Sequence, residues 1–153
     1  MTHTAAWSQA TQFDADPESV ARARHFVEWH LGEHGRSSLA DDLRLIVSEL
    51  ATNAVVHGSG APFTVSLAET AGEVTVSVRD HGTTRLVPRP RSPSLVESGR
   101  GLVLVDAVSA AWGVSSDDGR RTCVWATVPV PDPGEHVGGA VRGATVTALD
   151  GRR

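Results

Sequence analysis

Two polar side chains stand one helical turn apart in an otherwise apolar segment, Ile46 to Gly58, which reads IVSELATNAVVHG. Glu49 offers an anionic carboxylate and Asn53 a neutral amide oxygen, so together they can hold one hard cation or one water molecule. On a helix both project beside the apolar stripe, where a core gives way to a cleft. The alternative is an exposed polar strip with a hydrogen bond between the two side chains, and the pair alone does not decide.

A second pattern follows a run of alternating residues that is typical of a strand. Asp80-His81-Gly82 places a carboxylate acceptor at the strand end, next to a glycine whose backbone a ligand can approach closely. Taken alone, D-x-G is also an ordinary turn signal.

A third pattern is Ser98-Gly99-Arg100-Gly101-Leu102, which leads into an apolar helix predicted over Val103 to Trp112. Free backbone N–H groups at a glycine-rich helix start, together with the positive end of the helix dipole, form an anion site that needs no lysine. A hinge or a plain helix cap is the alternative for this motif.

All fourteen basic residues are arginines. The absence of lysine excludes a Walker A phosphate loop, the protein-kinase fold with its strand lysine, and Schiff-base chemistry. The net charge is −4, and no run of basic residues is longer than two. The sequence therefore predicts no basic surface that would bind nucleic acid. The single cysteine, Cys123, excludes a disulfide framework and a cysteine metal site.

No apolar run approaches the roughly eighteen residues of a membrane span, and the first residues lack a basic stretch followed by an apolar one. We therefore expect no membrane contact and a cytoplasmic protein.

The hydrophobic periodicity predicts one α+β domain over residues 6–130 and a flexible tail over 131–153. The three histidines of the first predicted helix, His25, His30 and His34, are expected to be solvent-exposed because no further ligand completes a metal site. The first predicted elements are an edge strand over 6–13 and a helix that starts at Asp16-Pro17-Glu18 and ends at Gly32 or Gly35. A second helix over 38–57, capped by Ser38, precedes an antiparallel hairpin with strands around 63–67 and 74–78. The helix 103–112 and a connection over 113–119 lead to a strand over 121–130 that completes the sheet.

The three motifs in this order resemble the N box, G1 box and G2 box of the superfamily of gyrase, heat-shock chaperone, sensor histidine kinase and mismatch-repair ATPases. Within it, SELATNAVVHG, VRDHG and GRGLVLVDAVSAAWGV, with TCVWATV completing the sheet, resemble the anti-sigma factor serine kinases of the RsbW and SpoIIAB type and the small stand-alone ATPase-like regulators of actinobacteria. The resemblance covers about residues 6–130. It implies the Bergerat fold, an α+β two-layer sandwich in which a mixed, mostly antiparallel sheet packs on about three helices.

Carried over residue by residue, the resemblance implies ATP and Mg²⁺ as cofactors. Asn53 would be the Mg²⁺ ligand that ties the phosphates to the helix, Glu49 the general base, and Asp80 the acceptor of the adenine amino group beside Gly82. The residues implied for the lid hinge and the phosphate-binding helix start are Gly99, Arg100 and Gly101, with Leu102 beside them in the nucleotide site. One position departs from the family: the G1 box commonly reads D-x-G-x-G, whereas Thr84 occupies its last position.

We therefore expect an ATP-dependent protein serine/threonine kinase that binds a sigma factor and phosphorylates its anti-sigma factor antagonist, a STAS-type protein. The alternatives are a nucleotide-gated protein-binding regulator without phosphotransfer and a detached histidine-kinase catalytic domain. Glu49 favours the first, because a pure binding module needs no base. A helix face around Glu18 and Arg22 is the candidate surface for the sigma factor, and a homodimer is expected from the resemblance alone.

Overall fold

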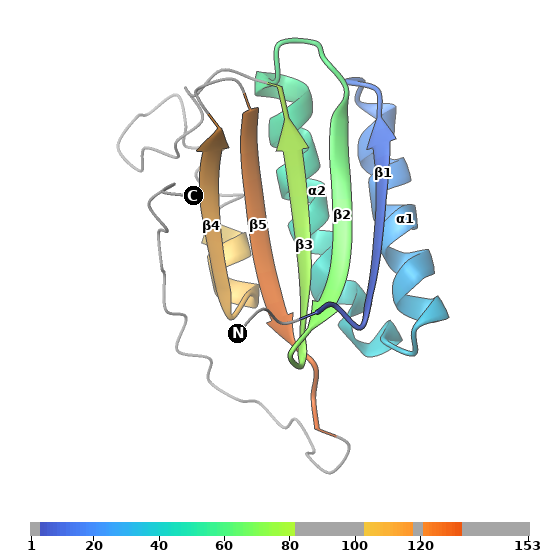
Figure 1. Cartoon of the computed structure of the whole chain (residues 1–153). Helices are drawn as coiled ribbons and strands as arrows, with labels where there is room; N and C mark the ends of the chain where they lie inside the picture. Colours follow the sequence, from blue (N-terminus) through green and yellow to red (C-terminus); the bar gives the residue numbers. More distant parts are fainter. Residues whose placement is uncertain (1–3, 82–102, 118–120, 133–153) are drawn as a thin grey trace.

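The chain folds into two layers, a five-stranded sheet with helices on one face (Figure 1). The computed structural model describes residues 4–81, 103–117 and 121–132. In chain order its elements are β1 (Trp7–Phe13), α1 (Glu18–Glu33), the short 3-10 helix η1 (Ser37–Leu39), α2 (Ala40–His57), β2 (Phe63–Thr70), β3 (Glu73–Asp80), a helical turn over residues 103–108, β4 (Ala111–Asp117) and β5 (Arg121–Pro129).

The strands lie in the order β1-β2-β3-β5-β4, and each neighbouring pair of these described strands is antiparallel. Ala71 and Gly72 join β2 to β3 with φ of 52° and 77°, the left-handed pair that a two-residue hairpin turn requires. The predicted hairpin and the edge position of β1 are confirmed. The α+β two-layer fold class is confirmed as well.

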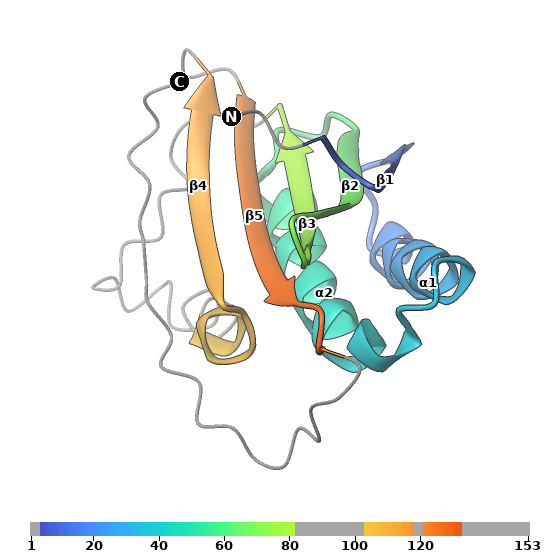
Figure 2. The same cartoon turned by 60° about the horizontal axis from the view of Figure 1, so that its bottom comes forward.

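The core forms between the sheet and the apolar face of α2. The residues predicted for that face are all at most 5% exposed; they are Leu39, Leu43, Ile46, Val47, Leu50 and Ala54. Alternate residues of β2 and β3 meet them from the sheet; they are Phe63, Val65, Leu67, Val74, Val76 and Val78. Figure 2 shows α1 and α2 on the same side of the sheet, with the turn 103–108 near one end of β4.

The prediction of a helix over 103–112 was wrong at its second half, and β4 was not foreseen. The Ala110 N–H donates to the Thr127 carbonyl, so the chain enters the sheet immediately after the helical turn. Within β4, Trp112 donates its indole N–H to Asp106 at 3.0 Å. The periodicity of this segment is helical, but the backbone pairing with β5 and this packing of Trp112 outweigh it.

The starts of the two long helices differ in their side-chain caps. Ser38 does not cap α2, because it lies within η1 and the helix begins at Ala40 without a side-chain cap. Asp16 does act at the start of α1, since its carboxylate accepts the Ser19 N–H at 2.9 Å.

The expected exposure of the three histidines holds for His25 alone. His30 and His34 are half-buried: the ring of His34 stacks on Trp7 at 4.0 Å between centroids, and that of His30 meets Phe26 edge to face at 4.7 Å. None of the helices in the described ranges is both long and apolar enough to cross a membrane.

A polar cluster fastens the β1 edge to the loop after α1. Arg36 donates two hydrogen bonds to the Glu69 carboxylate, at 2.7 and 2.9 Å, and the Trp7 indole N–H donates a third at 3.1 Å. The hydrogen bonds from Arg36 lower the pKa of Glu69, and the bond to Glu69 raises the pKa of Arg36. Because the folded-state pKa of Glu69 is lowered, its stabilisation is present above the ordinary glutamate pKa and is lost as pH falls through the folded value.

We expect Glu69→Gln to lower the free energy of unfolding by about 1–2 kcal/mol at pH 7, because the charge-assisted hydrogen bonds to Arg36 are weakened. Urea unfolding of both proteins, repeated at decreasing pH, measures the difference. It should shrink as pH falls below the ordinary glutamate pKa toward the lowered pKa of the folded protein, because the wild-type carboxylate then takes up a proton. A difference that stays constant from pH 7 to pH 3 would contradict this account of the cluster.

Candidate functional site

The flank of α2 carries the first two predicted site residues, Glu49 and Asn53. Both are half-buried, and neither side chain forms a hydrogen bond or ion pair with any residue in the described ranges. Their neighbours behave differently, since Ser48 donates to the Arg44 carbonyl at 2.7 Å and Thr52 to the Ser48 carbonyl at 2.6 Å. The alternative of a hydrogen bond between Glu49 and Asn53 is therefore not what the structure contains.

This contrast matters because the polar atoms of Glu49 and Asn53 are not among the buried, unbonded atoms of the described residues, so water or a ligand can reach them. Glu49 and Asn53 lie one turn apart on the same helix face, so their oxygens can approach one ligand. The described residues contain no group of three or more His, Cys, Asp or Glu side chains that could hold a metal ion. A cation beside Asn53 would therefore complete its coordination with oxygens of a bound ligand and water, as Mg²⁺ ordinarily does.

Asp80 ends β3 and is only 5% exposed. The register of β3 and β5 places Thr122 directly opposite it, and Thr122 is 3% exposed. Directly opposed side chains of antiparallel strands lie on the same face with Cβ atoms about 5 Å apart. The Thr122 hydroxyl is buried without a hydrogen-bond partner in the described part of the chain.

Gly58 joins this end of the sheet to the end of α2. It is buried, and a Cβ added there would overlap the Ala54 carbonyl oxygen and lie 3.5 Å from the Asp80 Cβ. Just beyond, the Ser59 hydroxyl donates to the His81 carbonyl at 3.4 Å. In Figure 1, α2 and β3 accordingly end together at the upper edge of the molecule, where β5 begins.

The structure thus places Glu49, Asn53 and Asp80 on α2 and β3, two elements that pack against each other and end together. The remaining predicted site residues, Gly82, Gly99, Arg100, Gly101 and Leu102, lie outside the described residues, as does Thr84. Their assigned roles stay predictions.

Thr122 is the residue that sequence reasoning missed. In the alternating pattern of this strand, Val124, Ala126 and Val128 share one face. Thr122 lies two residues before Val124 and belongs to the same face. A polar residue at the start of that buried face was the signal.

Asp80 and Thr122 together present a carboxylate acceptor and a hydroxyl that donates or accepts. This combination suits the edge of an aminopurine, where an exocyclic N–H₂ donor stands next to a ring-nitrogen acceptor. The candidate site therefore has a base-recognition end on the sheet and a cation or phosphate end on α2.

Comparison with known protein families identifies the kind of domain that carries this site. The sequence profile described as "Histidine kinase-like ATPase domain" matches residues 13–128, which include β2, β3, β4, β5 and both long helices. The chain belongs to this family. A histidine kinase-like ATPase domain implies ATP as the ligand, which agrees with the aminopurine edge inferred from Asp80 and Thr122.

One curated relative shares 38% identity over 85 residues, which is 49% of this chain and 74% of the relative. It is an uncharacterized protein of Streptomyces coelicolor. The similarity shows that the chain has a relative of this kind and says nothing about its ligand or substrate.

The orphaned hydroxyl of Thr122 gives a direct test of the base-recognition end. We expect Thr122→Val to change the free energy of unfolding by less than about 1 kcal/mol, because the lost hydroxyl leaves no partner unsatisfied among the described residues. ATP affinity should fall about two- to tenfold, the worth of one hydrogen bond.

Urea unfolding and calorimetric titration with ATP measure the two quantities. A variant that is strongly destabilised while ATP affinity is unchanged would show that the hydroxyl serves the fold and not the nucleotide.

Proposed function

We propose that the chain is a cytoplasmic, ATP-dependent protein serine/threonine kinase that also binds a sigma factor, and that its phosphoacceptor is a hydroxyl of an anti-sigma factor antagonist. The observation that supports this proposal best is the pair of half-buried side chains Glu49 and Asn53, which bond to no described residue, in a histidine kinase-like ATPase domain. A carboxylate without a partner in this part of the fold is available to act on a substrate.

Asn53 would hold Mg²⁺, which supplies charge neutralisation on the phosphates when it is bound. The donor set fits this ion, because a neutral amide oxygen next to an anionic ligand is a hard-oxygen site and Mg²⁺ needs few protein ligands. Asn53 lies in the last turns of α2, and the close contact at Gly58 fixes that end of the helix against β3. The metal end and the base end of the nucleotide site are therefore carried by one rigid unit.

Glu49 would act as the general base. The hydroxyl oxygen of the acceptor residue forms a bond to the γ-phosphorus while the bond from that phosphorus to the β,γ-bridging oxygen breaks. The proton of the hydroxyl passes to the Glu49 carboxylate, and ADP leaves with the electron pair of the broken bond. Positioning and charge neutralisation account for most of the acceleration in such transfers, and the base adds to them.

At the other end of the nucleotide, Asp80 would accept the adenine amino group and Thr122 would donate to or accept from the neighbouring ring position. Gly99, Arg100 and Gly101, with Leu102, would bind the phosphates through backbone N–H groups, which is consistent with a chain that has no lysine. A homodimer belongs to the same proposal, on resemblance alone.

Glu49→Gln tests the catalytic role, because glutamine keeps the size of the side chain and cannot take the proton. We expect ATP affinity to stay at the wild-type value and phosphoryl transfer from γ-labelled ATP to the co-purified antagonist to fall about 10²- to 10⁴-fold. Calorimetry measures the affinity and label incorporation measures the transfer.

Thr52→Ala is the matched control. Thr52 lies in the same part of α2 as Glu49, is exposed, and donates its hydroxyl hydrogen bond to the Ser48 carbonyl. It should leave both quantities unchanged. Wild-type transfer by the Glu49→Gln variant would rule out the base, and ATP binding without any transfer by the wild-type chain would favour a nucleotide-gated binding regulator.

A further inference from the structure

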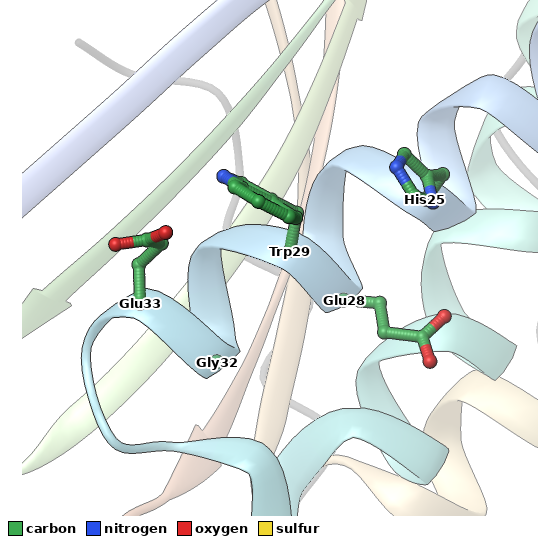
Figure 3. Close-up of a pocket in the computed structure, with 5 residues that line it drawn as sticks. All are labelled: His25, Glu28, Trp29, Gly32 and Glu33. Atoms are coloured by element: carbon green, nitrogen blue, oxygen red, sulfur yellow. The ribbon is translucent and has the colours of Figure 1, made fainter.

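The exposed face of α1 carries an aromatic and acidic hollow near its C-terminal end (Figure 3). It is an open hollow of about 490 Å³, lined by His25, Glu28, Trp29, Gly32 and Glu33. We refer to it as the α1 hollow. In Figure 3 the Trp29 ring and the Glu33 carboxylate rise from the same side of the helix, while Glu28 points toward α2.

Trp29 differs from the other tryptophans of the chain. Trp7 stacks on His34 and donates to Glu69, Trp112 donates to Asp106, and Trp125 covers Gly113 so closely that a Cβ there would meet its ring. Trp29 is 58% exposed, and His25, tilted and 6.5 Å away between centroids, is the one ring that it meets among the described residues. A large exposed indole of this kind is the residue type most enriched in binding hot spots.

Two carboxylates border the Trp29 indole, and they differ in their ion pairs. Glu28 already forms an ion pair with Arg44, with 3.7 Å between the Glu28 Oε2 and the Arg44 Nε. Glu33 has no ion pair with any residue in the described ranges. Because Trp29 and Glu33 are four residues apart on one helix, their side chains are neighbours on its surface, and Figure 3 shows both on the same side of α1.

Gly32 lines the hollow on the side of Trp29 that faces Glu28. A Cβ added there would find its nearest neighbour at 3.8 Å, the Ser37 hydroxyl, so the backbone does not require glycine for want of room. Glycine within a helix costs about 0.5–1 kcal/mol relative to alanine. Here its missing side chain provides a floor against which a flat group can lie.

We propose that the α1 hollow is a docking site for an arginine side chain presented by a protein partner. A guanidinium is planar, so it can stack on the Trp29 indole as a cation on a π face and direct its N–H fork to the Glu33 carboxylate. An ammonium group is a compact, strongly hydrated point charge and matches only the second of these contacts.

This proposal goes beyond the proposed phosphotransfer and does not depend on it. Arg44, whose partner Glu28 borders the hollow, lies nine residues before Asn53 on α2, about 14 Å along the helix axis. A partner bound at the α1 hollow therefore leaves the candidate nucleotide site accessible.

The test uses the full-length ¹⁵N-labelled chain without nucleotide, so its outcome is independent of ATP binding. Three capped pentapeptides serve as probes, each with four alanines around a central arginine, citrulline or lysine. We expect the arginine peptide to shift the Trp29 indole signal and the backbone amides of residues 28–33 saturably at millimolar concentration. The citrulline peptide should shift neither, and the lysine peptide should bind several-fold more weakly.

Three variants assign the contacts. Glu33→Gln should weaken arginine binding about two- to fivefold, the range of an exposed ion pair. Trp29→Ala should abolish the shifts of the α1 amides, and its folding can be checked by urea unfolding. Glu73→Gln is the matched control, an exposed glutamate at the start of β3 that lies outside the hollow, and it should bind like the wild type.

Equal shifts with the arginine and citrulline peptides, or equal weakening by Glu33→Gln and Glu73→Gln, would overturn the proposal. A concentration-dependent dimer that Trp29→Ala abolishes would overturn it in favour of a second copy of the chain as the occupant.

Discussion

The candidate site depends on the close packing of the last turn of α2 against the end of β3. Gly58 lies at this junction, where a side chain would collide with the Ala54 carbonyl oxygen and its Cβ would already be in van der Waals contact with the Asp80 Cβ. The packing brings a helix flank that bears Glu49 and Asn53 to the same edge of the molecule as the buried pair Asp80 and Thr122. A nucleotide can contact both groups of residues, because it has a base at one end and phosphates at the other.

Helix α2 divides its polar groups between folding and function. The hydroxyls of Ser48 and Thr52 bond back to the helix carbonyls, and Arg44 forms an ion pair with Glu28 of α1, so these groups have partners within the fold. Glu49 and Asn53 are half-buried and bond to no residue in the described ranges. Their polar atoms therefore stay available to a ligand that binds along this flank of α2.

Much of this arrangement could be predicted from sequence, because it follows from local periodicity. The core face of α2, the β2–β3 hairpin and the position of Asp80 at a strand end all come from patterns of spacing 3.6 or 2. The strand β4 could not be predicted this way, since Trp112 and Gly113 owe their extended conformation to pairing with β5 and to the Trp125 ring that lies over Gly113.

Long-range pairing also explains why Thr122 was overlooked. Its importance follows from lying opposite Asp80, a register that no local pattern contains. The same holds for the Arg36–Glu69 pair, which joins residues 33 positions apart and fastens the β1 edge.

The most direct measurement is a calorimetric titration of the full chain with ATP, in Mg²⁺ and in EDTA, for the wild type and for Asn53→Ala. The account predicts that the wild type binds ATP more tightly in Mg²⁺. In Asn53→Ala that gain should be lost, lowering the affinity in Mg²⁺ by roughly tenfold or more, the worth of a hydrogen bond to a charged group or greater. An Asn53→Ala variant that keeps the full Mg²⁺ dependence, or a wild-type chain that binds no ATP in either condition, would contradict it.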